Sequence, residues 1–137
     1  MKKRTSSAVW NGTGKEGKGT MSSKSTALNK VQYSYSSRFE EGVGTNPEEL
    51  VAAAHAGCFS MKLAFVLNAA GLTADEIHTD CTITLDNGAI TESHLVLKAK
   101  VPGATKEKFD AAAEDARQNC PISKLLNTKI TLDAHLV

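Results

Sequence analysis

The chain lacks a surplus of charge of either sign. Its 16 Lys and Arg residues nearly balance 15 Asp and Glu residues, which leaves a formal net charge of +1 at pH 7. A protein that binds nucleic acid through phosphate contacts presents a broad basic face, from which binding releases counterions. We therefore expect no nucleic-acid partner.

Long apolar runs are also lacking. The longest one is interrupted by Lys62, Asn68 and Gly71, so it falls short of the roughly 18 residues that a membrane span requires. Residues 1–4 have the charge of a secretory signal, but polar Thr and Ser occupy residues 5–7, where an apolar core belongs. These features predict a cytoplasmic protein with no membrane partner.

Closely spaced metal ligands and cofactor motifs are missing as well. The four histidines and three cysteines include no CxxC or HxxxH pair, which zinc sites typically use. Gly12, Gly14 and Gly17 match GxGxxG, but a Thr/Ser-rich segment follows where the phosphate-binding helix is needed. We expect no metal and no cofactor. Cys81 lies in an alternating segment and is interpreted as a half-buried strand residue without chemistry.

What the chain does contain is the pattern of one mixed domain. A length of 137 residues suits a single domain over residues 1–137. Alternating apolar residues, turn signals and helix caps predict an α+β fold. The expected elements are three strands (5–10, 18–25, 31–37), a helix (47–70), a hairpin (77–85, 90–101), a helix capped by Thr105 and broken at Cys120-Pro121, and a strand (130–136).

The helix expected over residues 47–70 has the strongest start signals in the chain. Thr45 or Asn46 can cap it, Pro47 fits the first turn, and Glu48 and Glu49 oppose the helix dipole. Apolar residues cover nearly every side of this helix. We therefore expect it to be central and buried.

Two widely separated cysteines are the candidates for chemistry. Cys58 lies deep inside the apolar helix, and Cys120 follows about sixty residues later. A thiol in such a setting is ordinarily a small inert hydrophobe. A thiol that reduces peroxides must be deprotonated beside a cation or dipole, and a second thiol must reach it to resolve the sulfenic acid. Because cytosolic cysteines are kept reduced, a disulfide here would be transient and catalytic.

The nearest candidate for the cation is Arg38, which is expected at the end of the third strand. Glu48 can fix its guanidinium through two parallel hydrogen bonds. Glu48 precedes Cys58 by ten residues, or about 15 Å of helix axis at about 1.5 Å per residue, so it cannot touch Cys58 of a straight helix. Either the helix breaks or a second subunit supplies its glutamate. The all-round apolar helix favours the second option, an intimate homodimer with sites at its interface.

The residues alone leave the order of the thiols and the reaction class open. Cys120 begins a short helix whose free amides stabilise a thiolate, so it could attack while Cys58 resolves. A cysteine hydrolase or acyltransferase could instead use His55, which shares a helical face with Cys58, as its base. A noncatalytic redox sensor, whose disulfide changes a partner contact, is the third reading.

The runs GTNPEELVAAAHAGCFSMKL and CPIS resemble the OsmC (osmotically inducible protein C) family, which also includes the organic hydroperoxide resistance proteins. The resemblance extends over nearly the whole chain and is closest to the OsmC branch. It implies an OsmC-like α+β fold, in which antiparallel sheets wrap around long central helices in an intertwined homodimer.

The resemblance also implies an activity, that of a cysteine-based peroxidase protecting against oxidative stress. Such an enzyme reduces organic hydroperoxides, including those of fatty acids, to alcohols, and hydrogen peroxide less well. By motif position, Cys58 corresponds to the peroxidatic thiol, Cys120 to the resolving thiol, and Arg38 with Glu48 to the pair that activates the site. An external dithiol, for which a lipoylated protein is a candidate, then reduces the disulfide.

Overall fold

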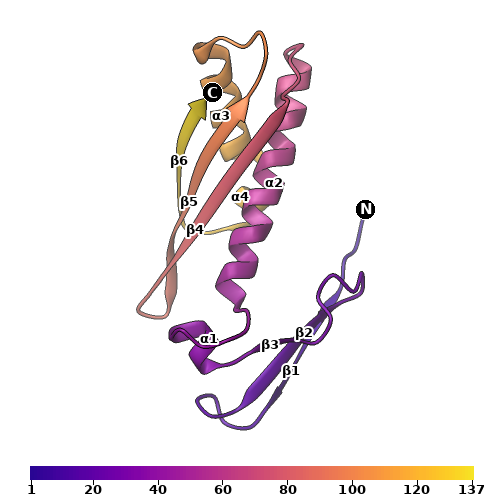
Figure 1. Ribbon diagram of the computed structural model, residues 1–137, viewed down its shortest axis with the longest axis vertical. Coiled ribbons are helices and arrows are strands. Elements are labelled where there is room, and N and C mark those ends of the chain that lie inside the picture. Colours follow the sequence, from indigo (N-terminus) through magenta and orange to yellow (C-terminus); the bar gives the residue numbers. More distant parts are fainter. The chain divides into compact units, whose positions relative to one another are not determined.

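The computed structural model describes all 137 residues and divides into two compact units, Met1–Leu50 and Val51–Val137 (Figure 1). The expectation of one domain over residues 1–137 stays a prediction. In chain order the elements are β1 (Ser6–Asn11), β2 (Lys18–Ser23), β3 (Val31–Tyr33), α1 (Tyr35–Phe39), α2 (Pro47–Ala69), β4 (Glu76–Asp86), β5 (Ala89–Lys100), α3 (Lys106–Asn119), α4 (Pro121–Leu125) and β6 (Lys129–Leu136).

The first unit contains an antiparallel sheet in the order β1-β2-β3. Gly19 is its tightest point, because it pairs with both Trp10 and Tyr33 on the neighbouring strands. A Cβ atom at Gly19 would lie 2.5 Å from ring atoms of each aromatic residue. The two rings themselves pack with their centroids 5.2 Å apart. Glycine is therefore required where these rings cross the middle strand.

The third strand is shorter than predicted and gives way to a helical turn. β3 ends at Tyr33, and Ser34 caps α1: the Ser37 amide donates to Ser34 Oγ at 3.1 Å, while the Ser34 amide donates to Ser37 Oγ at 2.8 Å. This reciprocal capping box overrides the strand-like alternation, because serine bonds readily to nearby backbone amides. Arg38 therefore lies in the last turn of α1 and not at a strand end.

The prediction of the long helix is confirmed closely. α2 runs unbroken to Ala69, and Gly71 follows with a φ of +79°, the left-handed conformation that glycine adopts easily. At the start, the Glu49 amide donates to Asn46 Oδ1 at 2.7 Å. Asn46 therefore caps the helix, while Thr45 Oγ1 bonds to the Glu49 carboxylate at 2.7 Å.

Only one stripe of α2 is covered within the chain, so the expectation of a buried helix holds for one face alone. The buried positions recur every four residues, as one helix face requires, and are His55, Phe59, Leu63 and Leu67. Met61 and Phe65 are each 65% exposed. By length and hydropathy α2 could even cross a membrane, contrary to the expectation from sequence. One such helix is a weak indication, because core helices pass the same test.

The second unit contains a sheet in the order β4-β5-β6. β4 and β5 form the predicted antiparallel hairpin, and Asn87 and Gly88 at its turn both have positive φ, as type I′ turns require. β6 pairs with β5 in parallel, so the expectation of purely antiparallel sheets is wrong for this strand. The reason is the connection: α3 and α4 lie between β5 and β6 and allow a crossover to the same end.

Helices pack against one face of this sheet, where the core of the second unit lies (Figure 1). α2 supplies large side chains, α3 supplies mainly alanines, and β5 supplies alternate residues. Close packing of α3 is possible because small residues let the helix backbone approach. The α+β class is confirmed. The fully buried larger residues of this core are Phe59, Leu63, Leu67, Leu95, Leu97, Phe109 and Cys120.

Candidate active site

Arg38 and Glu48 form an ion pair in the first unit. Arg38 Nε donates to Glu48 Oε1 at 2.7 Å, and the side chains are 41% and 12% exposed. The pair forms as expected, but through one hydrogen bond and not the two of a bidentate fork. Glu48 Oε2 is buried without a hydrogen-bond partner. This oxygen can therefore accept a hydrogen bond from a further donor.

Cys58 and Cys120 are brought together in the second unit. Cys58 is half-buried on α2, and Cys120 is fully buried where α3 ends and α4 begins. Cys120 caps α4: its Sγ accepts from the Ser123 amide at 3.4 Å and contacts Ser123 Oγ at 3.0 Å. All the cysteines are free thiols.

The second unit by itself does not activate Cys58. Burial raises the pKa of the Cys58 thiol above its ordinary value of 9.0; a hydrogen bond from the Ile122 backbone lowers it, and the neighbouring Cys120 thiol raises it. Burial dominates because the charged thiolate loses solvation in a poorly polar setting. A thiolate at Cys58 at neutral pH therefore needs a further positive charge.

His55 is fully buried and uses both ring nitrogens. Nδ1 lies 2.6 Å from Ser93 Oγ on β5, and Nε2 lies 2.8 Å from Ser123 Oγ on α4. Burial lowers the pKa of His55 below its ordinary 6.5, which favours the neutral ring. Neither nitrogen is left for Cys58, which argues against the hydrolase reading with His55 as the base for that thiol.

Cys81 joins the same group of polar side chains from β4. Its Sγ contacts Ser93 Oγ at 3.3 Å, and the residue is half-buried on the strand, as predicted. Burial raises the pKa of the Cys81 thiol, and the Ser93 hydroxyl lowers it. A continuous chain of polar contacts therefore runs from Cys81 through Ser93, His55 and Ser123 to Cys120.

The two serines of this chain were missed by the sequence analysis, although each left a signal. Ser93 occupies an inward position of β5, in step with the buried Leu95 and Leu97, where a hydroxyl needs a partner. Ser123 stands three residues after Cys120 in CPIS, the spacing at which a capping residue receives a helix amide. Long-range pairing with His55 is not visible in either local pattern.

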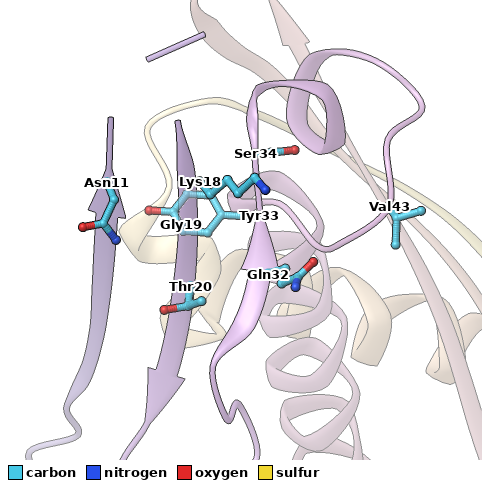
Figure 2. Close-up of a pocket in the computed structure, with 8 residues that line it drawn as sticks. All are labelled: Asn11, Lys18, Gly19, Thr20, Gln32, Tyr33, Ser34 and Val43. Atoms are coloured by element: carbon cyan, nitrogen blue, oxygen red, sulfur yellow. The ribbon is translucent and has the colours of Figure 1, made fainter. Parts of the chain in front are cut away.

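A separate hollow of about 360 Å³ lies on the sheet of the first unit (Figure 2). Its lining is polar and apolar in equal measure and includes no cysteine. Figure 2 shows the Tyr33 ring beside Gly19, with Val43 on a separate loop at the right of the view. The lining residues are Asn11, Lys18, Gly19, Thr20, Gln32, Tyr33, Ser34 and Val43.

No group of three or more His, Cys, Asp or Glu side chains is placed to hold a metal ion.

Comparison with known proteins identifies clear relatives. The family model described as OsmC-like protein matches residues 40–135. The chain is 44% identical over 133 residues to the Escherichia coli protein named "Peroxiredoxin OsmC", covering 94% of this chain and 93% of that protein. It is 30% identical over 97 residues to "Organic hydroperoxide resistance protein-like 1" of Staphylococcus saprophyticus, covering 68% and 69% of the two chains.

The fold has relatives among solved structures. The OsmC-like protein from Mycoplasma pneumoniae superposes with a TM-score of 0.79, covering 99% of this chain and 98% of that one at 16% sequence identity. At this identity the likeness shows the fold alone. The OsmC-like fold expected from the sequence is thereby confirmed.

Proposed function

This chain belongs to the OsmC-like protein family, and from that premise we propose that it is a thiol-dependent peroxidase. Its substrates are organic hydroperoxides, which it reduces to alcohols, and hydrogen peroxide less well. The relatives named peroxiredoxin and organic hydroperoxide resistance protein support a peroxidase role. The cellular role is protection against oxidative stress in the cytoplasm.

One observation carries the proposal: Cys58 and Cys120 are neighbours although about sixty residues separate them in sequence. A single reactive cysteine suffices for a hydrolase, whereas a peroxidase that cycles through a disulfide needs two thiols within reach of one another. The second thiol here comes from a different element of the fold. The hydrolase reading leaves this juxtaposition unexplained, whereas the disulfide chemistry of a peroxidase or of a redox sensor requires it. Between those two, the names of the relatives favour the peroxidase.

The proposed mechanism gives each residue one role. Cys58 thiolate attacks the distal peroxide oxygen, the O–O bond breaks, and the alkoxide leaves and takes a proton. Arg38 stabilises the thiolate and the developing alkoxide, and Glu48 orients the guanidinium. The Cys58 sulfenic acid then condenses with Cys120 to give a disulfide and water. An external dithiol, with a lipoylated protein as a candidate, reduces that disulfide.

The same proposal includes a homodimer whose two sites lie at the subunit interface. Two observations support it. First, α2 is unbroken, so the helix arithmetic that keeps Glu48 from Cys58 of the same chain applies. Second, α2 has exposed apolar side chains at Met61 and Phe65 that a second copy can cover. Arg38 and Glu48 of one subunit then serve Cys58 of its partner.

Thiol counting tests the peroxidase directly. The reduced protein is mixed with one equivalent of cumene hydroperoxide, and free thiols are titrated in the wild type and in Cys58→Ser, Cys120→Ser and Cys81→Ser variants. We expect loss of two thiols in the wild type and in the Cys81 control, one in Cys120→Ser, and none in Cys58→Ser. A wild-type protein that loses no thiol would refute the proposal.

The remaining readings predict different results in the same samples. A redox sensor loses two thiols once but does not sustain peroxide consumption when a dithiol such as dihydrolipoamide is supplied. A cysteine hydrolase cleaves ester substrates without Cys120 and consumes no peroxide. Inversion of the thiol order would show as one thiol lost in Cys58→Ser and none in Cys120→Ser.

A further inference from the structure

We propose that His55, acting through the Ser123 hydroxyl, positions and deprotonates Cys120 when that thiol attacks the Cys58 sulfenic acid. The inference rests on the proposed function and assigns a task to side chains that the mechanism above leaves idle. His55 is a positioning residue in this scheme, because it touches Ser123 and not the reacting sulfur atoms.

The geometry of the contacts is the first argument. Ser123 Oγ lies 3.0 Å from Cys120 Sγ and 2.8 Å from His55 Nε2, so one hydroxyl bridges the thiol and the imidazole. A hydroxyl can accept the thiol proton and donate its own to the ring. Ser123 is buried like its two partners. Solvent is therefore a poor competitor for the proton of Cys120.

The contacts on the far side of the ring are compatible with the tautomer that the relay needs. Ser93 Oγ, 2.6 Å from Nδ1, can accept the Nδ1 proton while its own proton points to Cys81 Sγ at 3.3 Å. Nε2 is then free to accept from Ser123. This arrangement of base, orienting partner and bridged nucleophile is the pattern by which enzymes activate weak nucleophiles. Burial keeps the ring neutral, and thus able to accept, near neutral pH.

The need for such a relay follows from the surroundings of Cys120. The thiol is fully buried, so bulk water does not reach its proton, and the polar groups in contact with its sulfur are the amide and hydroxyl of Ser123. The ring nitrogens of His55 contact the hydroxyls of Ser93 and Ser123, and these hydroxyls in turn contact the thiols of Cys81 and Cys120. No carboxylate or cation forms an ion pair or hydrogen bond with the ring. The imidazole is therefore the base connected to Cys120.

The step balances as follows. The Cys120 electron pair forms the bond to Cys58 Sγ, and the S–O bond of the sulfenic acid breaks with its pair on the leaving hydroxide. The Cys120 proton passes to Ser123 Oγ as the Ser123 proton passes to His55 Nε2. The imidazolium returns a proton along the same route to the hydroxide. The products are the disulfide, water and neutral His55.

The test separates sulfenic acid formation from its resolution. Reduced protein is mixed with cumene hydroperoxide and quenched at intervals with dimedone, and mass spectrometry measures sulfenic acid and disulfide. The variants are Ser123→Ala, His55→Gln, Ser123→Thr, and Ser60→Ala as the matched control. Ser60 is also on α2 and bonds to Thr79 at 2.7 Å, outside this chain of contacts. Circular dichroism checks that each variant folds.

Loss of the relay has a defined signature. Sulfenic acid formation stays within about twofold of wild type, whereas disulfide formation slows by about a hundredfold, the usual worth of general base catalysis, in Ser123→Ala and His55→Gln. Ser123→Thr keeps the hydroxyl and recovers most of the rate. Wild-type resolution is nearly independent of pH from about 7 to 8.5, whereas the relay-free variants gain about tenfold per pH unit, as an unassisted thiol does. Resolution at the wild-type rate and pH profile in Ser123→Ala overturns the proposal.

A second oxidant keeps this outcome separate from failure of the peroxidase itself. Diamide adds to one thiol, and the second thiol displaces the adduct to close the disulfide without any peroxide. If the wild type consumes no peroxide but diamide closure still slows in Ser123→Ala and His55→Gln, the relay stands and the peroxidase falls. If the rate of disulfide closure with diamide is unchanged in Ser123→Ala and His55→Gln, the relay is overturned.

Discussion

The two units of this protein differ in the kind of chemistry that each provides. The first unit holds an ion pair, Arg38 with Glu48, whose guanidinium is partly exposed. The second holds three thiols and a neutral histidine among apolar side chains, with no cation paired to any of them. The proposed activating charge therefore lies in one unit and the proposed nucleophiles lie in the other.

Within the second unit, the surroundings of Cys58 disfavour its thiolate form. Burial raises the pKa of Cys58 in the second unit, and the nearby Cys120 adds to the effect. In the mechanism that we propose, the same burial protects the Cys58 sulfenic acid from solvent. Under this proposal, the Cys58 thiolate depends on the positive charge of Arg38 from the partner subunit.

Removal of that charge should have the largest effect. Arg38→Ala should raise the pKa of Cys58 further and slow peroxide reduction by about a hundredfold to a thousandfold, the usual cost of losing one charge-stabilising donor. The rate of peroxide reduction in Arg38→Lys should lie between those of the wild type and Arg38→Ala, because lysine keeps the charge but lacks the planar guanidinium. Stopped-flow measurement of peroxide consumption checks this.

Arg117→Ala is the control, because Arg117 pairs with Glu114 on α3 and donates to the Ile130 carbonyl, and neither partner belongs to the proposed site. It should leave the peroxide rate near that of wild type. An Arg38→Ala variant as fast as this control would remove Arg38 from the mechanism and leave the contrast between the units without functional meaning.

Complementation between inactive variants should show whether charge and thiol come from different subunits. Mixed and reassembled Cys58→Ser and Arg38→Ala chains form heterodimers in which one site has both residues. Random pairing should then restore about a quarter of the wild-type activity, because half of the dimers carry one good site of two. Steady-state turnover of the mixture measures it. Activity no greater than that of the separate variants would place the whole site within one subunit.

Charges on the exposed apolar side chains of α2 should disrupt the proposed dimer, which is the next largest effect. Met61→Glu or Phe65→Glu places a charge where we propose that the partner packs, and should convert the dimer to monomers at micromolar concentration. Light scattering gives the mass. Val43→Glu, at another exposed apolar position outside the helix, is the control and should not change it. A wild-type monomer would contradict the interface directly.

Local signals in the sequence were enough for most of the fold but not for the contacts within the site. The caps, Gly71 and the Asn87-Gly88 turn are local devices, and the elements that they delimit are confirmed. At residues 34–37, the alternation of apolar and polar residues predicted a strand, whereas the capping serines form α1. The parallel strand β6 depends on a crossover that no local pattern specifies. Pairing across the fold, such as His55 with Ser93 and Ser123, cannot be deduced from spacing along the chain.

The buried His55 should make the free energy of unfolding depend on pH in mild acid. Because the pKa of His55 is lowered in the folded state, the unfolded chain binds a proton that the folded chain does not when the pH falls below the ordinary value of 6.5. The free energy of unfolding should then fall with a slope approaching about 1.4 kcal/mol per pH unit. His55→Gln should remove this slope in urea titrations between about pH 6.5 and 5.

The pH range of this measurement matters because a second group, Glu114, titrates at lower pH. The pKa of Glu114 is lowered to about 2, first by its hydrogen bond with Arg117, so its contribution is present above 4.5 and is lost as the pH falls toward 2. A slope between pH 6.5 and 5 that persists in His55→Gln would show that another group, and not this ring, titrates on unfolding.

The smallest effect tests whether the two units behave as one domain. Ser34→Ala removes the cap of α1 in the first unit, and Thr105→Ala removes the cap of α3 in the second; each should cost about 1 kcal/mol. Trp10, the single tryptophan, reports on the first unit by fluorescence, while far-ultraviolet circular dichroism is dominated by α2 and α3. For one domain, both probes should follow a single urea transition in both variants. If Ser34→Ala shifts the fluorescence transition alone, the units unfold separately, and the charged pair is held by a module independent of the thiols that it serves.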